Sequence, residues 1–436
     1  MISRRRELLS LLLCFLTCLI STDLSAVLFQ PGVGIGLEAT DNVKLTPDDT
    51  KSELIANTYV GASLSENEGA LEYNADARLS RRKYLQNTFP DKRYLNLNAS
   101  ADWAMIKDHV DWFVRDRFSQ RTIVALNANT PDNLQDSNVF TLGVNIRRPS
   151  ASRHAFSLTP RFDQYYYEQS RTNNRQYSLA ANWNYLLSRR TQTGISLKTK
   201  EIDYFESQFA GVRFNTLSAL LSGQSKRTGY ALSLGNTSVE RDTGEETSGF
   251  SGFVRFSAEL SSSSSLSAVA STSLTDTSSV TNTPDLPPGS GDDVQIVTDV
   301  VRNSNAGITY TREDASLRSS VWVRYGETTY SDNPLDRKTR GLGIRAAYPV
   351  QPLLVAGAYI NYDRSNQLVS GREDERYRAG GDLNYSFSRK LRGTLDVEYR
   401  TKDSNVLSQN YDEFSVFASL VYGFGSVPRG SQAGGG

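Results

Sequence analysis

The sequence is almost free of cysteine, histidine and methionine, with two of each among its 436 residues. Both cysteines, Cys14 and Cys18, lie within the first 26 residues. From residue 27 onward the chain therefore cannot form disulfides, thiolate metal sites or a thiol nucleophile.

Net charge and long apolar runs are also missing. The chain has 48 Lys and Arg against 48 Asp and Glu, so no overall field favours nucleic acid. After residue 26 no run of apolar residues is long enough for a transmembrane helix, which needs about 18. Aromatic residues make up 10% of the chain, which is too many for a disordered protein.

The first 26 residues predict a secretory signal peptide. Arg4, Arg5 and Arg6 precede an apolar stretch over residues 8–20, and the small residues Ser25 and Ala26 follow it. These features are typical of signals that carry a chain across the inner membrane. An uncleaved anchor helix is the alternative, but the apolar stretch is short for a membrane span. We therefore expect one mature domain over residues 27–425 and a flexible tail over residues 426–436.

The dominant pattern after the signal is alternation of apolar and polar residues. Leu71, Tyr73, Ala75, Ala77 and Leu79 alternate with polar neighbours, for example. The same period recurs near residues 95–103, 140–146, 177–185, 250–260 and 414–424. Side chains of a β-strand switch faces at every residue, so the pattern predicts strands with one apolar face. No comparable stretch has helical spacing, and we expect an all-β protein.

The breaks between strands alternate between short and long along the whole chain. Short breaks fall near residues 66–69, 107–109, 149–151, 188–190, 224–227, 261–265, 312–314, 349–352 and 388–390. Longer polar breaks fall near residues 42–51, 86–92, 126–137, 169–174, 203–210, 240–248, 276–299, 329–338, 364–376 and 402–411. This rhythm predicts a single transmembrane antiparallel β-barrel of about 20 strands, with a range of about 16–20, and both termini at the short-turn side.

The rhythm has a physical cause in bacterial outer-membrane barrels. These barrels combine tight periplasmic turns with longer outer loops, and a sheet can cross lipid only if it closes on itself. A soluble sandwich would also alternate, but it needs neither strands this long nor so regular a rhythm. The sequence therefore predicts a location in the bacterial outer membrane, with its lipid as a partner.

The polar face of each strand is expected to line the interior of the barrel, because a charge facing hydrocarbon costs about 2–4 kcal/mol near the midplane. Tyr73, Trp103, Trp112, Tyr185, Tyr325, Tyr385 and Tyr422 suit the aromatic girdles of the outer face. The residues predicted to line the lumen are Glu72, Asp76, Arg78, Asp102, Asp111, Arg115, Arg117, Arg161, Asp163, Tyr165, Tyr167, Arg318, Arg324, Arg378, Asp382, Asp396, Glu398 and Arg400.

The lumen charges have two interpretations. Opposite charges on adjacent strands can pair and fill the wall, or they can line a hydrated path and set its selectivity. Their mixed sign suggests no strong preference for anions or cations. A barrel of this size, if unplugged, would enclose a wide lumen, although an infolded loop such as residues 276–299 could narrow it. Inward Tyr165 and Tyr167 beside Arg161 could also stack on sugar rings.

Catalytic and cofactor chemistry is not indicated. His109 and His154 both fall at predicted periplasmic turns, whereas barrel enzymes place catalytic groups near the outer rim. The glycine-rich residues 31–36 open a strand rather than a helix and lack a following Lys, so they form no phosphate-binding loop. The carboxylates are too scattered to nominate an acid–base pair. We expect no enzyme activity, no metal and no cofactor.

Both ends of the mature chain resemble a known family. Residues 33–42 (VGIGLEATDN), followed by a second strand at residues 52–57, and the closing residues 412–424 (DEFSVFASLVYGF) are similar to outer-membrane β-barrels associated with exopolysaccharide biosynthesis and PEP-CTERM loci of Gram-negative bacteria. The resemblance implies export or assembly of a polysaccharide, with periplasmic export components as partners.

Three functions follow from these observations. The first is an outer-membrane conduit that carries or assists exopolysaccharide export. The second is a general diffusion porin for small solutes, which the alternation permits equally well. The third is a barrel enzyme or surface adhesin. The positions of the histidines disfavour the enzyme, and the modest loop lengths disfavour the adhesin.

Overall fold

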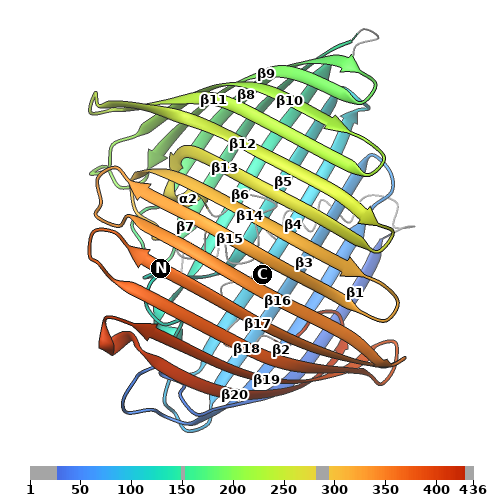
Figure 1. The fold of residues 1–436 in the computed structure, drawn as a ribbon, viewed down its shortest axis with the longest axis vertical. Coiled ribbons are helices and arrows are strands. Elements are labelled where there is room, and N and C mark those ends of the chain that lie inside the picture. The colour runs from blue at the N-terminus through green and yellow to red at the C-terminus, as the bar shows by residue number, and fades with distance from the viewer. Residues whose placement is uncertain (1–26, 149–152, 281–293, 428–436) are drawn as a thin grey trace.

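The computed structural model describes residues 27–148, 153–280 and 294–427, and it is a closed antiparallel β-barrel (Figure 1). A single 20-stranded sheet closes on itself because β1 pairs with β20. Each other strand pairs with its neighbours in the sequence. The predicted fold class and strand number are therefore confirmed. The predicted signal peptide, residues 1–26, lies outside the described residues.

The strands of the first half of the barrel are β1 (Leu28–Thr40), β2 (Glu53–Glu66), β3 (Leu71–Tyr84), β4 (Lys92–Ile106), β5 (Val110–Thr122), β6 (Leu134–Arg148), β7 (His154–Tyr167), β8 (Asn174–Ser188), β9 (Thr191–Tyr204) and β10 (Val212–Gln224). The second half consists of β11 (Thr228–Arg241), β12 (Glu246–Ser261), β13 (Ser264–Asp276), β14 (Val300–Glu313), β15 (Arg318–Tyr330), β16 (Arg337–Gln351), β17 (Leu354–Gln367), β18 (Glu373–Ser386), β19 (Leu391–Ser404) and β20 (Tyr411–Gly423).

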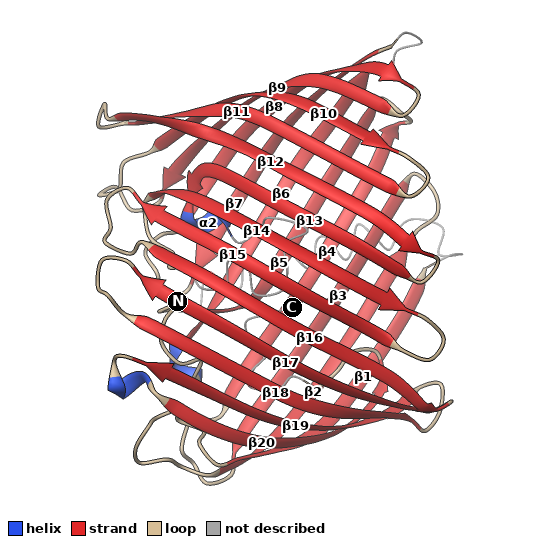
Figure 2. Cartoon of the chain, in the orientation of Figure 1, coloured by secondary structure: helices blue, strands red, loops and turns tan. Residues whose placement is uncertain are grey.

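Within the described residues, the helical pieces are short and lie in the connections, namely η1 (Pro131–Asn133), α2 (Thr277–Val280) and η2 (Leu407–Gln409) (Figure 2). In the described part of the chain, none of these helices has the length and apolar character needed to cross a membrane.

The connections follow the predicted rhythm. Short turns gather at one end of the barrel, which we call the short-turn end, and longer connections at the other, which we call the loop end. The first strand starts and the last strand finishes at the short-turn end. The predicted break at residues 149–151 lies outside the described residues.

The ladder register separates the two faces of the wall. Residues directly opposite each other on neighbouring strands point to the same face. One side chain of known direction therefore gives the direction of every residue that lies in register with it around the barrel. The Tyr59 side chain is buried inside the barrel and lies opposite Gly34 and Ser80. Along β1, the side chains of Val33, Ile35 and Leu37 alternate with the inward positions and are more than half exposed. Apolar side chains thus face outward, where lipid surrounds a barrel of this kind, and the polar ones face the lumen.

Charged residues of the outer face gather at the loop end. Arg213 on β10 forms ion pairs with Glu201 and Glu240 of the neighbouring strands there. The strands have 13 to 16 residues, more than the roughly 9–11 that span a bilayer, so their loop ends extend beyond the hydrocarbon. Asp116 is an exception, because it lies in the middle of β5 opposite Ala99 and Phe140 of the outer face.

The two strands β12 and β13 separate from each other toward the loop end. Their ladder ends at Gly252 and Thr272, so residues 246–251 of β12 have no partner on β13. The loop end of β13 instead turns away from β12 and leads into α2, as Figure 1 shows. The paired part of β12, residues 252–261, has about the length that crosses a bilayer. The separation therefore occurs beyond the hydrocarbon, where an open strand edge is not forbidden.

Candidate functional site

The register places the side chains predicted for the lumen on the inner face of the wall, including the acidic and basic residues of β3, β4 and β5. The same holds for those of β7, β15, β18 and β19. Arg318 lies at the short-turn end, where it is exposed and pairs with Glu313 at 3.1 Å. Whether these residues line a transport path remains a prediction.

One space in the lumen, which we call the central cavity, has a volume of about 990 Å³. Its lining extends from the β5–β6 connection, residues 123–133, at the loop end to residues 425–427 at the short-turn end. The inner faces of β15 to β20 supply most of the remaining wall. Of the predicted lumen residues, Arg324, Arg378, Asp382, Asp396 and Arg400 line this cavity.

Most charged residues that line the central cavity pair with a group of opposite charge in the wall. The Arg324 guanidinium lies 2.6 Å from the Asp363 carboxylate, and that of Arg345 lies 3.6 Å from Asp382. Arg378 and the Tyr359 hydroxyl both donate to the buried carboxylate of Glu398. This wall therefore fits the structural interpretation of the lumen charges, in which opposite charges pair and fill the wall, although Arg324 and Arg345 reach carboxylates two strands away rather than on the adjacent strand.

The β5–β6 connection closes over the loop end of the central cavity. The backbone carbonyl of Leu126 accepts hydrogen bonds from Arg372 at 2.9 Å and from Lys402 at 3.1 Å. Both cations also pair with the buried Asp374, at 3.0 and 3.3 Å respectively. A carboxylate in the wall thus holds two cations in place, and these in turn hold the connection.

A second obstruction comes from residues 273–280 and 294–299, which we call the infolded segment. At its start, the Asp276 carboxylate lies 2.6 Å from Lys200 on β9 and also accepts a hydrogen bond from Gln176 on β8. At its end, the Gln295 side chain bonds to the backbone of Ile123 and Ala125 in the β5–β6 connection. The described parts of the segment therefore lie inside the barrel and narrow the lumen, a possibility that the sequence analysis raised for residues 276–299; residues 281–293 lie outside the described residues.

Apolar contacts also hold the infolded segment against the wall. Leu274 and Val300 pack with inward side chains of β9, β10 and β11 in one buried cluster, namely Ile202, Val212, Phe214 and Val239. By the strand register Leu274 belongs to the outer face, like Phe250 on β12. Because the end of β13 turns inward, its outer face, which includes Leu274, packs against the inner wall of the barrel rather than facing lipid.

The structure corrects the interpretation of Tyr165 and Tyr167 as sugar-stacking residues. Both point inward, as predicted, but they are buried in a cluster with Ile296 of the infolded segment. Their exposed fractions are 2% and 1%, so neither ring offers a face to a solute. A contact between β7 and residue 296 has no local signature in the sequence.

The C-terminal residues turn back into the barrel. The Tyr59 hydroxyl donates to the carbonyl of Phe424 at 2.8 Å, and Val427 is buried against Tyr59, Phe417 and Val421. Gly34 makes this possible, since a Cβ there would lie 2.3 Å from the Tyr59 ring. The predicted flexible tail, residues 426–436, thus begins with an exposed Ser426 and a buried Val427; residues 428–436 lie outside the described residues.

The two histidines lie at the short-turn end. His109 is in the turn before β5, where its ring contacts the carbonyl of Lys107. His154 is the first residue of β7 and lies on the outer face, where the Trp183 indole donates to its Nδ1 at 3.1 Å. Within the described residues, no three His, Cys, Asp or Glu side chains are arranged to hold a metal ion.

Sequence reasoning missed several residues of the central cavity, namely Trp322, Arg345, Tyr359, Arg376 and Lys402. The alternation could have found them, because each lies at an inward position of β15 to β19. Two aromatic rings were overlooked because aromatic residues were assigned to the outer girdles.

Comparison with known proteins gives one match to a sequence family. Residues 337–424 match the family described as "Putative beta-barrel porin 2". This stretch covers β16 to β20, part of the central cavity wall. No curated protein sequence matches the chain.

Among solved structures, similar folds include the FrpB iron transporter from Neisseria meningitidis (F5-1 variant), with 10% identity over 91% of this chain and 82% of that one and a TM-score of 0.48. OccK2 (OpdF) from Pseudomonas aeruginosa has 8% identity over 91% of this chain and 98% of that one, with a TM-score of 0.41. A mutant ferric enterobactin receptor (PfeA) from Pseudomonas aeruginosa has 10% identity over 92% and 81%, with a TM-score of 0.46.

Proposed function

We propose that the protein is a hydrated conduit of the bacterial outer membrane that carries or assists the export of an exopolysaccharide. The observation that supports a conduit is the central cavity, whose lining extends from the loop end to the short-turn end. Its wall is polar and contains the aromatic rings of Trp322, Tyr359 and Tyr411, surfaces that suit a hydroxylated solute. The similarity of residues 33–42 and 412–424 to barrels of exopolysaccharide loci supports the polymer as cargo.

The β5–β6 connection and the infolded segment both restrict the lumen. Hydrogen bonds between Gln295 and the backbone of Ile123 and Ala125 join them into one obstruction. A lumen narrowed in this way suits a solute that passes as a single extended chain. Loops and connections that move by a few ångströms commonly gate such paths.

A general diffusion porin is the second candidate. The match of residues 337–424 to a porin family supports it. The two functions differ in the solute that passes through the lumen. A diffusion porin conducts small ions and solutes and does not bind polymers, whereas an export conduit interacts with a chain of sugars.

Deletion of the gene in its native host tests the export function. If the protein exports a polymer, the mutant should retain polysaccharide in the periplasm and lose it from the surface, and the intact gene should restore it. Unchanged surface polymer would count against export. In planar bilayers, a steady conductance that neutral oligosaccharides do not affect would favour the diffusion porin instead.

A further inference from the structure

A second space lies in the lumen at the short-turn end, against β8 to β13, and has a volume of about 880 Å³. We call it the basic pocket. Its cationic lining residues are Arg189 and Arg190 from the β8–β9 turn, Lys226 and Arg227 from the β10–β11 turn, and Arg255 from the inner face of β12. The only carboxylate among the residues that line it is that of Glu259.

The pocket exists because the inner wall is built from small residues here. Ser222, Gly229, Ala231, Ser257, Ser265 and Ser267 occupy successive inward positions of β10 to β13. Larger side chains at these positions would fill the space. The hydroxyl groups of the serines add hydrogen-bonding capacity while keeping the side chains small.

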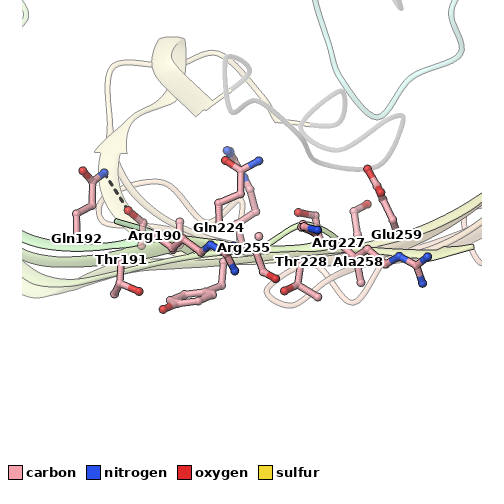
Figure 3. A pocket seen from close by; sticks show the side chains of 18 of the residues that line it. Arg190, Thr191, Gln192, Gln224, Arg227, Thr228, Arg255, Ala258 and Glu259 are labelled. Atoms are coloured by element: carbon pink, nitrogen blue, oxygen red, sulfur yellow. Dashed lines mark hydrogen bonds between the residues drawn. The ribbon is translucent and has the colours of Figure 1, made fainter. Parts of the chain in front are cut away.

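Amide side chains complete the lining. Figure 3 shows Gln192, Gln224 and Arg255 extending from the lumen side of the wall, whereas Thr191 and Thr228 lie on its opposite side. The Gln192 amide donates to the Ser222 hydroxyl at 3.1 Å and keeps its carbonyl oxygen for another partner. The pocket thus offers cationic, amide and hydroxyl groups to the same volume.

The charge balance of the basic pocket differs from that of the central cavity. In the central cavity Arg324 and Arg345 each pair with a carboxylate two strands away, whereas Arg189, Arg190, Lys226 and Arg227 have no ion-pair partner in the described part of the chain. The mixed sign expected of the lumen therefore does not hold locally. Adjacent cations of this kind at a pore mouth concentrate anions, and the attraction weakens as salt increases.

We propose that the basic pocket binds an acidic polysaccharide as the chain approaches the lumen from the short-turn end, which faces the periplasm in outer-membrane barrels. The inference rests on the proposed export function and adds the class of polymer. The cations would contact the carboxylates of the sugar units, and the serine and glutamine side chains their hydroxyl groups. Phospholipid headgroups are the other source of anions, but Gln192, Gln224 and Arg255 face the lumen and cannot reach the lipid.

The test measures current through the full mature chain in planar bilayers of zwitterionic lipid. Oligogalacturonate is the acidic probe, and maltohexaose is the neutral probe of similar length. We expect oligogalacturonate to block the current at about a tenfold lower concentration when added at the short-turn end than at the loop end, with a weaker block at higher salt. Maltohexaose should show neither preference.

Two double variants probe the pocket, Arg189→Gln with Arg190→Gln, and Lys226→Gln with Arg227→Gln. Each should weaken the block by oligogalacturonate about tenfold and reduce the difference between the two ends. The matched control is Arg389→Gln with Lys390→Gln, which removes two adjacent cations from the β18–β19 turn at the same end but outside the pocket. In this control, oligogalacturonate should block the current at the same concentration as in the unaltered protein.

The outcomes separate the two proposals. A channel that conducts, but is blocked equally from both ends or is unaffected by the pocket variants, overturns the basic pocket as a polymer site and leaves the conduit standing. A folded barrel that conducts nothing overturns the conduit. Loss of binding to anionic vesicles in the pocket variants, with block unchanged, would assign the cations to lipid and also overturn the inference.

Discussion

The ammonium group of Lys200 on β9 lies 2.6 Å from the carboxylate of Asp276 at the end of β13, although 76 positions separate the two residues in the sequence. Both side chains are almost fully buried, and Lys200 also lies over the ring of Phe214. This pair joins the infolded segment to the inner wall of the barrel. The pair therefore helps to hold the lumen narrow.

Replacement of Asp276 by Asn should release the infolded segment. Removing one partner of a buried ion pair costs about 3–5 kcal/mol, because the other charge stays buried without compensation. We expect a larger single-channel conductance, with the barrel itself intact. The double variant Lys200→Met with Asp276→Leu should restore much of the narrow state, since apolar residues can replace a buried pair.

A matched control for this experiment is Arg213→Gln, which removes two exposed ion pairs, with Glu201 and Glu240, on the outer face of β9 to β11. Its conductance should equal that of the unaltered protein. Closed barrels resist detergent until heated, so cold and boiled samples on a gel report whether each variant still folds. An unchanged conductance in a folded Asp276→Asn variant would contradict the role of the pair.

The C-terminal residues offer a second way to alter the lumen. Substitution of Val427 by Asp would place a carboxylate in the apolar cluster of Tyr59, Phe417 and Val421. An ionised group is not tolerated there without a partner, so the C-terminal residues should leave the wall of the central cavity. We expect a higher conductance and faster proteolysis of the C-terminus. Val427→Ile keeps the apolar contact and should behave like the unaltered protein.

The outer face contains a polar pair whose removal should change stability. The Asn138 amide donates to the Asp116 carboxylate at 2.6 Å in the middle of the wall. Since a carboxylate facing lipid is unfavourable by up to about 2 kcal/mol, Asp116→Asn should raise the free energy of unfolding. Asn138→Ala should lower it by about 1–3 kcal/mol, because it leaves the carboxylate without its donor.

Urea unfolding in lipid vesicles measures both effects on the outer-face pair. Glu240→Gln, on the same face but at the loop end beyond the hydrocarbon, is the control and should be close to neutral. A less stable Asp116→Asn protein would show that the position is hydrated rather than in contact with lipid.

The β14–β15 turn predicts a dependence on pH. The backbone N–H and hydroxyl groups of Ser316, the backbone N–H of Leu317 and the guanidinium of Arg312 bind the Asp314 carboxylate and lower its pKa to about 2. Because the folded pKa lies below the unfolded value of about 3.9, the stabilisation of the turn is complete above that value. It is lost as the pH falls through about 2.

Nuclear magnetic resonance of the side-chain carboxyl carbon can follow this titration. We expect a midpoint near 2 for Asp314 and a shift toward the ordinary value in Ser316→Ala, which removes the hydroxyl donor while keeping the backbone ones. A midpoint near 3.9 in the unaltered protein would mean that the turn is open in solution.

Much of the fold could be predicted from the sequence. The alternation through Leu71 to Leu79 and its repeats indicated strands, and the rhythm of short and long breaks indicated a closed barrel of 20 strands. Both are local signals, because side-chain direction changes at each residue and the length of a turn depends only on consecutive residues. The inward position of a residue such as Arg324 follows from the same alternation.

The content of the lumen depended on the tertiary structure. Alternation assigns a residue to a face, but it does not say which charge lies opposite it on the next strand or what covers it. Arg324 pairs with Asp363 across an intervening strand, whereas among the described residues Arg190 and Arg227 have no carboxylate partner. Tyr165 and Tyr167 are inward yet covered by Ile296, more than a hundred positions away.

The amino-acid sequence by itself determined that this chain forms a cylinder with an apolar exterior, because period-two patterning acts within each strand. Only the three-dimensional arrangement decided where that cylinder is narrow, where its charges cancel and where positive charge remains. Those properties arise from contacts between strands and connections far apart in the chain, such as Lys200 with Asp276, and no local pattern encodes them.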